Sequence, residues 1–95
     1  MEITLPIIHL NGTAPQDLKD AREVVFDQLQ GALLKMCYVA PNGRDYYPEP
    51  GRLELAEAQH QRRCKAIHDL MRELEYEMEA IDTLKAGGRP MVFES

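Results

Sequence analysis

The residues most able to do chemistry form one short segment, which contains Asn42, Gly43, Arg44, Asp45, Tyr46 and Tyr47. Nucleotide sites are built from such residues. A tyrosine ring stacks on a base, and a guanidinium binds a phosphate through two parallel hydrogen bonds. Asn42 or Asp45 would then read a base edge. The structural alternative is more frequent for an isolated loop: Asn-Gly forms a turn, Asp45 pairs with Arg44, and the tyrosines cover the end of a hairpin.

A second candidate is an anion pocket at the start of a predicted helix. Asn11, Gly12 and Thr13 lie where free N–H groups and the helix dipole favour a negative charge. In an antiparallel hairpin the second helix ends at this place and brings Gly87-Gly88-Arg89 beside it. Arg89 and the backbone donors would then hold a phosphate. The alternative is an ordinary helix start and an ordinary helix end, which is more frequent for each segment alone.

Three residues with metal-binding side chains follow one another on the second predicted helix. His60, Cys64 and His68 are spaced at i, i+4 and i+8, and adjacent pairs have the spacing of metal ligands. The third position is rotated by about 80° from the first, so one ion is not readily shared by all three. The sequence therefore favours a buried cysteine and a partly buried histidine over a metal site. A metal ion bound across a symmetry axis of an oligomer is the remaining alternative. Cys37 and Cys64 are not expected to form a disulfide.

The sequence lacks the common catalytic signatures. It contains no Ser-His-Asp order, phosphate-binding loop, paired CxxC or HExxH helix. We therefore expect a protein that is not an enzyme and that has no cofactor.

Two predicted helices position these candidate residues. Residues 1–12 read as an extended, β-like arm interrupted by Pro6. The first helix is predicted over residues 13–39, with Thr13 as its N-cap, Pro15 in the first turn and Gln16 completing a capping box. Its predicted apolar stripe is Leu18, Ala21, Val25, Leu29, Ala32 and Met36. Off this stripe, and predicted to cover a second face, lie Val24, Phe26 and Leu33.

Residues 40–51 are rich in proline and glycine and are predicted to form a loop. The second helix is predicted over residues 52–86, and residues 87–95 form a tail whose apolar end could pair with the first arm. Gly87-Gly88 is expected to end the helix. From His60 onward, apolar residues recur with the heptad spacing of a helix–helix seam. The seam consists of Leu53, His60, Cys64, Ile67, Met71, Leu74, Met78 and Ile81.

The predicted fold is mainly α: one domain, an antiparallel two-helix hairpin with short β-like arms at both termini. Two helices bury too little surface for a stable monomer of this size, so we expect a homo-oligomer that shares the seam. About 39 Å separates the ends of the first helix. The tyrosine loop and the 11–13 turn can therefore meet only if a second subunit packs antiparallel, which would make a composite site.

Composition excludes several classes of function. The 95 residues include 16 acidic and 11 basic ones, for a net charge of −5, which argues against general nucleic-acid binding. No apolar run is long enough to span a membrane, and the first residues lack the features of a secretion signal. We expect a cytoplasmic protein. Arg62, Arg63 and Lys65 form a basic patch, followed by an acidic stretch with glutamates at positions 73, 75, 77 and 79.

Two strings in the sequence resemble a family of short accessory proteins encoded by tailed phages and prophages. They are His9-Leu10-Asn11-Gly12-Thr13 and Ala40-Pro41-Asn42-Gly43-Arg44-Asp45-Tyr46-Tyr47-Pro48. The resemblance implies expression in a bacterial host cell and, by context, a role against host defence. It transfers no catalytic residue.

Two functions remain open from the sequence. In the first, an oligomer sequesters a small anionic ligand, such as a cyclic nucleotide signal, between its subunits. In the second, the acidic surface and long helices bind a protein, either a host defence enzyme that is inhibited or a component of phage assembly.

Overall fold

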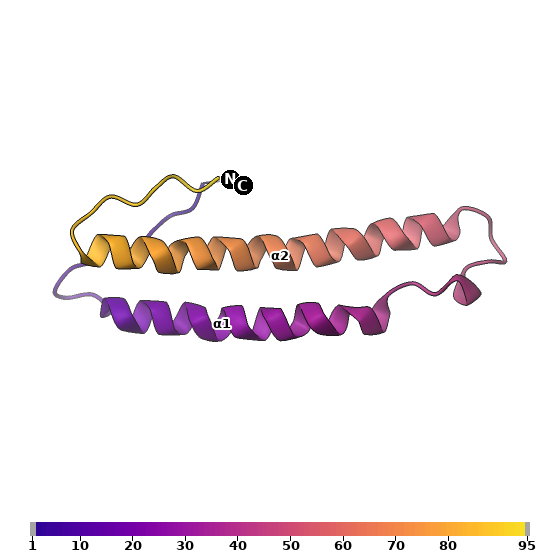
Figure 1. The fold of residues 1–95 in the computed structure, drawn as a ribbon, viewed down its shortest axis with the longest axis horizontal. Coiled ribbons are helices and arrows are strands. Elements are labelled where there is room, and N and C mark those ends of the chain that lie inside the picture. The colour runs from indigo at the N-terminus through magenta and orange to yellow at the C-terminus, as the bar shows by residue number, and fades with distance from the viewer. Residues whose placement is uncertain (1, 95) are drawn as a thin grey trace.

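The chain folds into an antiparallel pair of long α-helices, as the sequence predicts (Figure 1). The computed structural model describes residues 2–94. Helix α1 spans Pro15–Lys35 and helix α2 spans Arg52–Lys85. Two short 3-10 helices lie between them, η1 (Met36–Val39) and η2 (Gly43–Asp45). We call the end of the hairpin that carries residues 40–51 the loop end, and the opposite end the arm end.

The start of α1 differs from the prediction. Ala14 is the N-cap and no side chain caps the helix, so the predicted capping box of Thr13 and Gln16 is wrong. The Gln16 amide instead donates to Asp20 Oδ1 at 2.8 Å. Pro15 explains the difference: its ring disfavours the helical region for the preceding residue, so the helix begins at the proline and Thr13 lies one residue too early. The predicted place of Pro15, in the first turn, is confirmed.

The end of α2 agrees with the prediction that Gly87-Gly88 stops the helix. Gly87 has φ +82°, a left-handed conformation that glycine adopts without a steric penalty. Its N–H donates to Leu84 O at 3.0 Å, and the N–H of Gly88 donates to Thr83 O at 2.9 Å. These two bonds are the Schellman motif, which satisfies carbonyls left free at a helix end.

The helix–helix interface uses the predicted seam of α2 and half of the predicted stripe of the first helix, because Leu18, Leu29 and Met36 are half-buried as expected. Every seam residue of α2 is at least half-buried, and Met71 and Ile81 are fully buried. On α1, Ala21, Val25 and Ala32 are exposed, contrary to the predicted stripe.

The α1 face that packs on α2 lies about one residue further along. Its half-buried residues are Leu18, Arg22, Phe26, Leu29, Leu33 and Met36. Phe26 and Leu33 thus belong to the main interface and not to a separate second face. This face buries the larger Phe26 and Leu33 in place of Val25 and Ala32. Arg22 lies on it in place of Ala21, and its side chain forms an ion pair with Glu77 across the interface.

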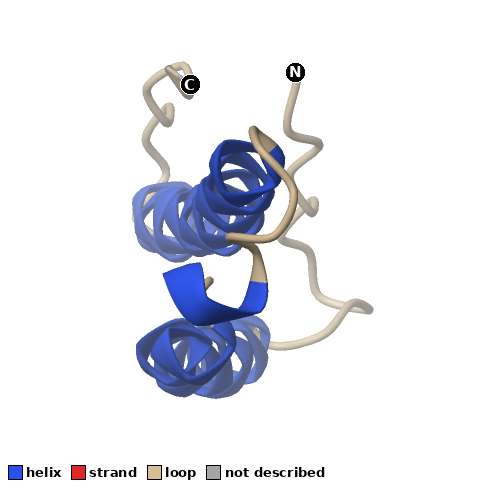
Figure 2. Cartoon of the chain, turned by 90° about the vertical axis from the view of Figure 1, so that its right-hand side faces the viewer, coloured by secondary structure: helices blue, strands red, loops and turns tan. Residues whose placement is uncertain are grey.

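The two arms cover the outer side of α2, away from α1 (Figure 2). Neither arm forms a strand within residues 2–94, so the predicted pairing of residues 3–10 with the tail is not made. The arms nevertheless bury Ala80, which points away from the heptad seam. The arm half of α2 is therefore packed on two sides, and the loop half on one.

The hairpin is long and open for its mass. A compact chain of 10.9 kDa exposes about 5,600 Å², whereas this chain exposes 7467 Å². Its radius of gyration is 18.6 Å, against about 12 Å for a compact domain of this length. Among the described residues only Met71, Ala80 and Ile81 form the buried apolar core. A single copy thus leaves much apolar surface in contact with water.

Candidate functional site

The tyrosine loop is a turn built by Asn42 and Gly43. The Asn42 side chain accepts a hydrogen bond from the Arg44 N–H at 3.0 Å, and its carbonyl accepts one from Asp45 at 2.9 Å. The Gly43 carbonyl accepts from the N–H groups of both tyrosines, at 3.2 and 3.0 Å. Asn42 therefore has the turn-forming role of the structural alternative, and its amide oxygen is already engaged.

The side chains that follow this turn face solvent. Tyr46 is half-buried, whereas Tyr47 is 79% exposed. Arg44 and Asp45 are exposed and do not pair with each other, and Arg44 takes part in no ion pair within residues 2–94. Tyr47 and Arg44 thus leave an aromatic ring and a guanidinium open to a ligand at the loop end.

The two segments of the predicted anion pocket lie at the same end of the hairpin, as expected, but few of their backbone N–H groups are free. The turn at residues 11–13 and the end of α2 lie at the same end of the hairpin (Figure 1). The Gly12 N–H donates to His9 O at 3.1 Å, and those of Gly87 and Gly88 serve the Schellman motif. Asn11, Thr13 and Arg89 are exposed. The Arg89 guanidinium, rather than the glycine amides, is the group left to attract an anion there.

The two candidate regions lie at opposite ends of a hairpin 62 Å long (Figure 1). The predicted separation within one chain is confirmed. A ligand held by both regions at once would therefore need two subunits.

The histidine and cysteine residues of α2 form no metal cluster. No group of three or more metal-binding side chains occurs in the part of the chain that the structure describes. His60 Nε2 lies 3.6 Å from Cys64 Sγ in a partly buried contact, consistent with their places on the seam. Cys64 is half-buried and Cys37 exposed, and both are free thiols.

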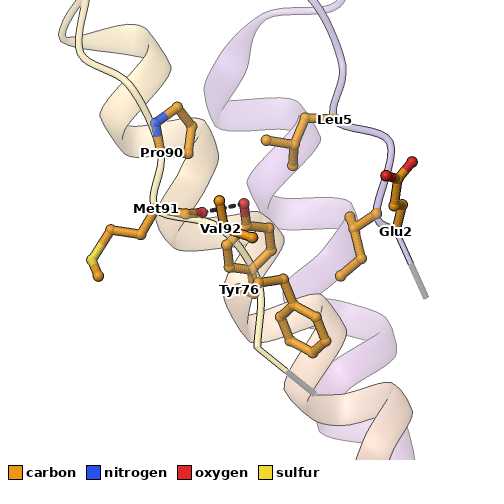
Figure 3. A pocket seen from close by; sticks show the side chains of 8 residues that line it. Glu2, Leu5, Tyr76, Pro90, Met91 and Val92 are labelled. Carbon is orange, nitrogen blue, oxygen red and sulfur yellow. Dashed lines mark hydrogen bonds between the residues drawn. The ribbon is translucent and has the colours of Figure 1, made fainter.

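The structure reveals a third site, formed by the arms on the outer side of α2 (Figure 3). The Tyr76 hydroxyl donates to the Met91 carbonyl, and its ring meets the Phe93 ring edge-to-face, with centroids 5.2 Å apart. The Arg72 guanidinium donates to Glu94 O at 2.9 Å and lies 5.7 Å from the Phe93 centroid. These contacts fix the tail along α2.

Between the arms lies a cleft of about 300 Å³. It is lined by Glu2, Ile3, Leu5, Tyr76, Pro90, Met91, Val92 and Phe93 (Figure 3). The sequence holds one signal for it: Tyr76 lies off the seam, and a buried tyrosine needs a partner for its hydroxyl. That signal identifies a covered outer face but not the segment that covers it.

The acidic stretch of α2 is divided between structural and exposed roles. Glu77 is largely buried in its ion pair with Arg22, at 2.6 Å, so it is not part of a free acidic surface. Glu75 and Glu79 are exposed. Lys65 donates to Asp69 at 2.6 Å, and this hydrogen bond lowers the pKa of Asp69 below its ordinary value.

Comparison of the chain with known protein families, curated proteins and solved structures finds no match. No helix in the described part of the chain combines the length and apolar character that crossing a bilayer requires.

Proposed function

We propose that this chain is a non-catalytic binding protein that forms homo-oligomers and sequesters a small anionic ligand, such as a cyclic nucleotide signal, between its subunits. One observation carries the proposal: the Tyr47 ring and the Arg44 guanidinium are both exposed at the loop end, and Arg44 has no ion-pair partner within residues 2–94.

The chemistry of these two groups suits a nucleotide. Base stacking on an aromatic ring contributes about 1–3 kcal/mol per base, and an unpaired guanidinium binds phosphate in a bidentate geometry. Because the Asn42 side chain is held by the turn, Asp45 is the remaining group in the loop that could read a base edge. At the other end, Arg89 would supply a second cation for the same ligand from a neighbouring subunit.

The exposed area supports the oligomer. The chain exposes 7467 Å², about 1,900 Å² more than a compact chain of its mass. Obligate homodimers bury about 2,000 Å² or more in total. Association would therefore remove an apolar surface that one copy leaves in water.

The resemblance to short phage and prophage proteins supplies the biological context. It favours an accessory protein made in the cytoplasm of a bacterial host, where capture of a nucleotide signal would weaken a host defence. This context rests on the strings at residues 9–13 and 40–48.

Native mass spectrometry tests the proposal, with a panel of cyclic dinucleotides, cyclic trinucleotides and ADP-ribose derivatives. We expect a discrete oligomer that gains a fixed number of ligand masses. Tyr47→Ala and Arg44→Ala should abolish the gain. Tyr38→Ala is the matched control, because Tyr38 is 81% exposed against 79% for Tyr47 but lies outside the loop. Equal binding by the Tyr47 and Tyr38 variants would exclude this site.

The second candidate function is binding of a protein, and it is favoured by the exposed carboxylates of Glu75 and Glu79 on one helix. A host enzyme or a phage assembly component with a basic surface would fit them. Charge reversal at Glu75 and Glu79 should then break a complex with a defined partner. Glu77 must be left intact in that experiment, because it holds the hairpin together through Arg22.

A further inference from the structure

A groove between α1 and α2 near the arm end combines an apolar floor with an acidic rim. Its volume is about 390 Å³, and Phe26 and Met78 form its floor. The rim carries Glu23, Asp27, Glu75, Glu79 and Asp82. Of these carboxylates, Asp82 is the one with an ion-pair partner within residues 2–94, and that partner, Lys19, also lines the groove. We call this feature the acidic groove. A basic, apolar surface is the occupant that its chemistry fits.

The hairpin itself carries such a surface at its other end, because its charge is segregated by halves. Near the arm end, residues 69–82 include six acidic residues and one basic residue. Near the loop end, residues 58–68 include three basic residues and no acidic one, and residues 28–39 of the first helical segment include one lysine and no acid. Two copies that pack end for end would therefore place unlike charges together.

The loop half also presents an apolar side chain on the same side of the hairpin as the groove. Leu34 is 74% exposed and follows Asp27 by seven residues and Glu23 by eleven, and both spacings share one side of a helix. On α2, Lys65 precedes Glu79 by fourteen residues and His68 precedes Glu75 by seven, whole numbers of heptads that return to one side of the helix. Leu34 thus offers an apolar side chain that suits the floor of the acidic groove, and Lys65 offers a positive charge that suits its acidic rim.

In a twofold dimer, Leu34 of one copy would contact the groove floor of the other, and Lys65 would contact its rim. The register of the two helices allows these two contacts to share one twofold axis. The Arg22–Glu77 and Lys19–Asp82 ion pairs set residue 30 of α1 level with residues 69–71 of α2. Residue 30 is the midpoint between Phe26 and Leu34, and the midpoints between Lys65 and its proposed partners Glu75 and Glu79 are residues 70 and 72. These midpoints are nearly side by side, as a self-complementary interface requires.

We propose that the acidic groove binds the loop half of a second copy of this chain in an antiparallel dimer, with Leu34 on the Phe26–Met78 floor and Lys65 against Glu75 and Glu79. The inference deepens the proposed function and rests on its homo-oligomer, because the same arrangement carries Tyr47 and Arg44 of one subunit toward residues 11–13 and Arg89 of the other. The excess exposed area of two chains together, about 3,800 Å², exceeds the roughly 2,000 Å² in total that an obligate homodimer buries.

Sedimentation equilibrium of the full chain gives the first test, with two leucine variants. Leu34→Asp should raise the dimer dissociation constant by about tenfold or more. Leu55→Asp is the matched control, since Leu55 is 73% exposed but takes part in neither proposed contact, and it should change the constant by less than about twofold. Equal effects of the two variants, or a wild-type chain that stays monomeric, would overturn the proposal.

A charge exchange gives the second test and does not depend on a single variant's folding. One variant carries Glu75→Lys and Glu79→Lys, and the other carries Lys65→Glu and His68→Glu. Each alone places like charges at both contacts of the twofold interface and should sediment as a monomer. An equimolar mixture places unlike charges at both contacts and should form a heterodimer. Lys85→Glu, in the last turn of α2 and in neither proposed contact, should remain a homodimer.

The outcomes separate this inference from the ligand proposal. A mixture that stays monomeric while both variants keep their helical circular dichroism overturns the docking surface. A dimer that passes both tests but gains no nucleotide mass supports the docking surface and overturns the proposal that the protein binds a nucleotide. Nucleotide binding by a wild-type chain that sediments as a monomer overturns the docking surface and leaves the Tyr47–Arg44 site in place.

Discussion

Arg22 of α1 forms an ion pair with Glu77 of α2 at 2.6 Å, with only 22% and 18% of the two side chains exposed. The guanidinium also donates to Leu18 O at 3.0 Å. This pair replaces an apolar contact in the middle of the helix–helix interface. It fixes which face of α1 is buried and how far the two helices are shifted along each other.

Arg22→Ala is expected to lower the free energy of unfolding by about 1–3 kcal/mol, because it leaves the Glu77 carboxylate without a partner in a mostly buried place. The double variant Arg22→Met with Glu77→Met should recover most of that loss. Urea unfolding followed by circular dichroism measures both. A double variant no more stable than Arg22→Ala would mean that the pair contributes more than charge compensation.

The observed face of α1 predicts a contrast between two apolar truncations. Leu33→Ala removes a half-buried side chain from the interface and should cost about 1–2 kcal/mol, below the range for fully buried leucines. Val25→Ala removes a side chain that is exposed in the structure and should cost less than about 0.5 kcal/mol. If the two costs were reversed, α1 would be rotated toward the stripe that the sequence alone favours.

Two glycine-to-alanine changes should have opposite signs. Gly87→Ala forces a side chain into a backbone with φ +82° and should destabilise the chain by about 1 kcal/mol. Gly31→Ala, in the interior of α1 with nothing within 4 Å of the new methyl group, should stabilise it by about 0.5–1 kcal/mol. Thermal unfolding of both variants gives the comparison, and a gain from Gly87→Ala would contradict the Schellman end of α2.

Tyr76→Phe is expected to loosen the tail, because it removes the hydrogen bond to the Met91 carbonyl while keeping the edge-to-face contact with Phe93. Digestion with a carboxypeptidase, followed by mass spectrometry, should trim the variant several times faster than the wild type. Tyr38→Phe is the control, since Tyr38 is exposed in η1, and it should leave the trimming rate unchanged. Equal trimming rates for the two variants would mean that the Tyr76 hydroxyl does not hold the tail in place.

The Lys65–Asp69 pair predicts a titration. The hydrogen bond from Lys65 lowers the pKa of Asp69. Its contribution to stability is therefore present above the ordinary pKa of an aspartate and is lost as the pH falls through the lowered value. Lys65→Met should raise the pKa of Asp69 toward that ordinary value. NMR titration of the carboxyl carbon measures it, and an unchanged pKa would assign the shift to other neighbours.

The sequence was sufficient for the helical hairpin, because Gly87 and the heptad seam of α2 act through local geometry and the 3.6-residue period. It was not sufficient for the face of α1, because the favourable burial of Arg22 depends on Glu77, a residue 55 positions away. Thr13 was misread because Pro15 restricts its predecessor more strongly than a capping side chain favours an earlier start.

In the candidate sites, too, the sequence predicts local features but not contacts between residues far apart in the chain. The turn at Asn42-Gly43 is a local feature, and its hydrogen bonds agree with the structural interpretation of that dipeptide. The exposure of Tyr47 and the absence of an Arg44–Asp45 pair are not encoded by spacing. The site around Tyr76 was not predicted, because it requires a tail that returns along the outer side of α2, and no local pattern specifies that return.

The burial of Ala80 under the arms has a consequence for motion along the hairpin. The three fully buried residues all lie between positions 71 and 81, where α2 is packed on both sides. The loop half has packing on one side only, so its opening requires less free energy. Amide hydrogen exchange should be slowest around Ile81 and become faster toward Arg52, and the helices should separate first at the loop end. The tyrosine loop would then change conformation more easily than the rest of the molecule, while the arm half of the hairpin stays rigid.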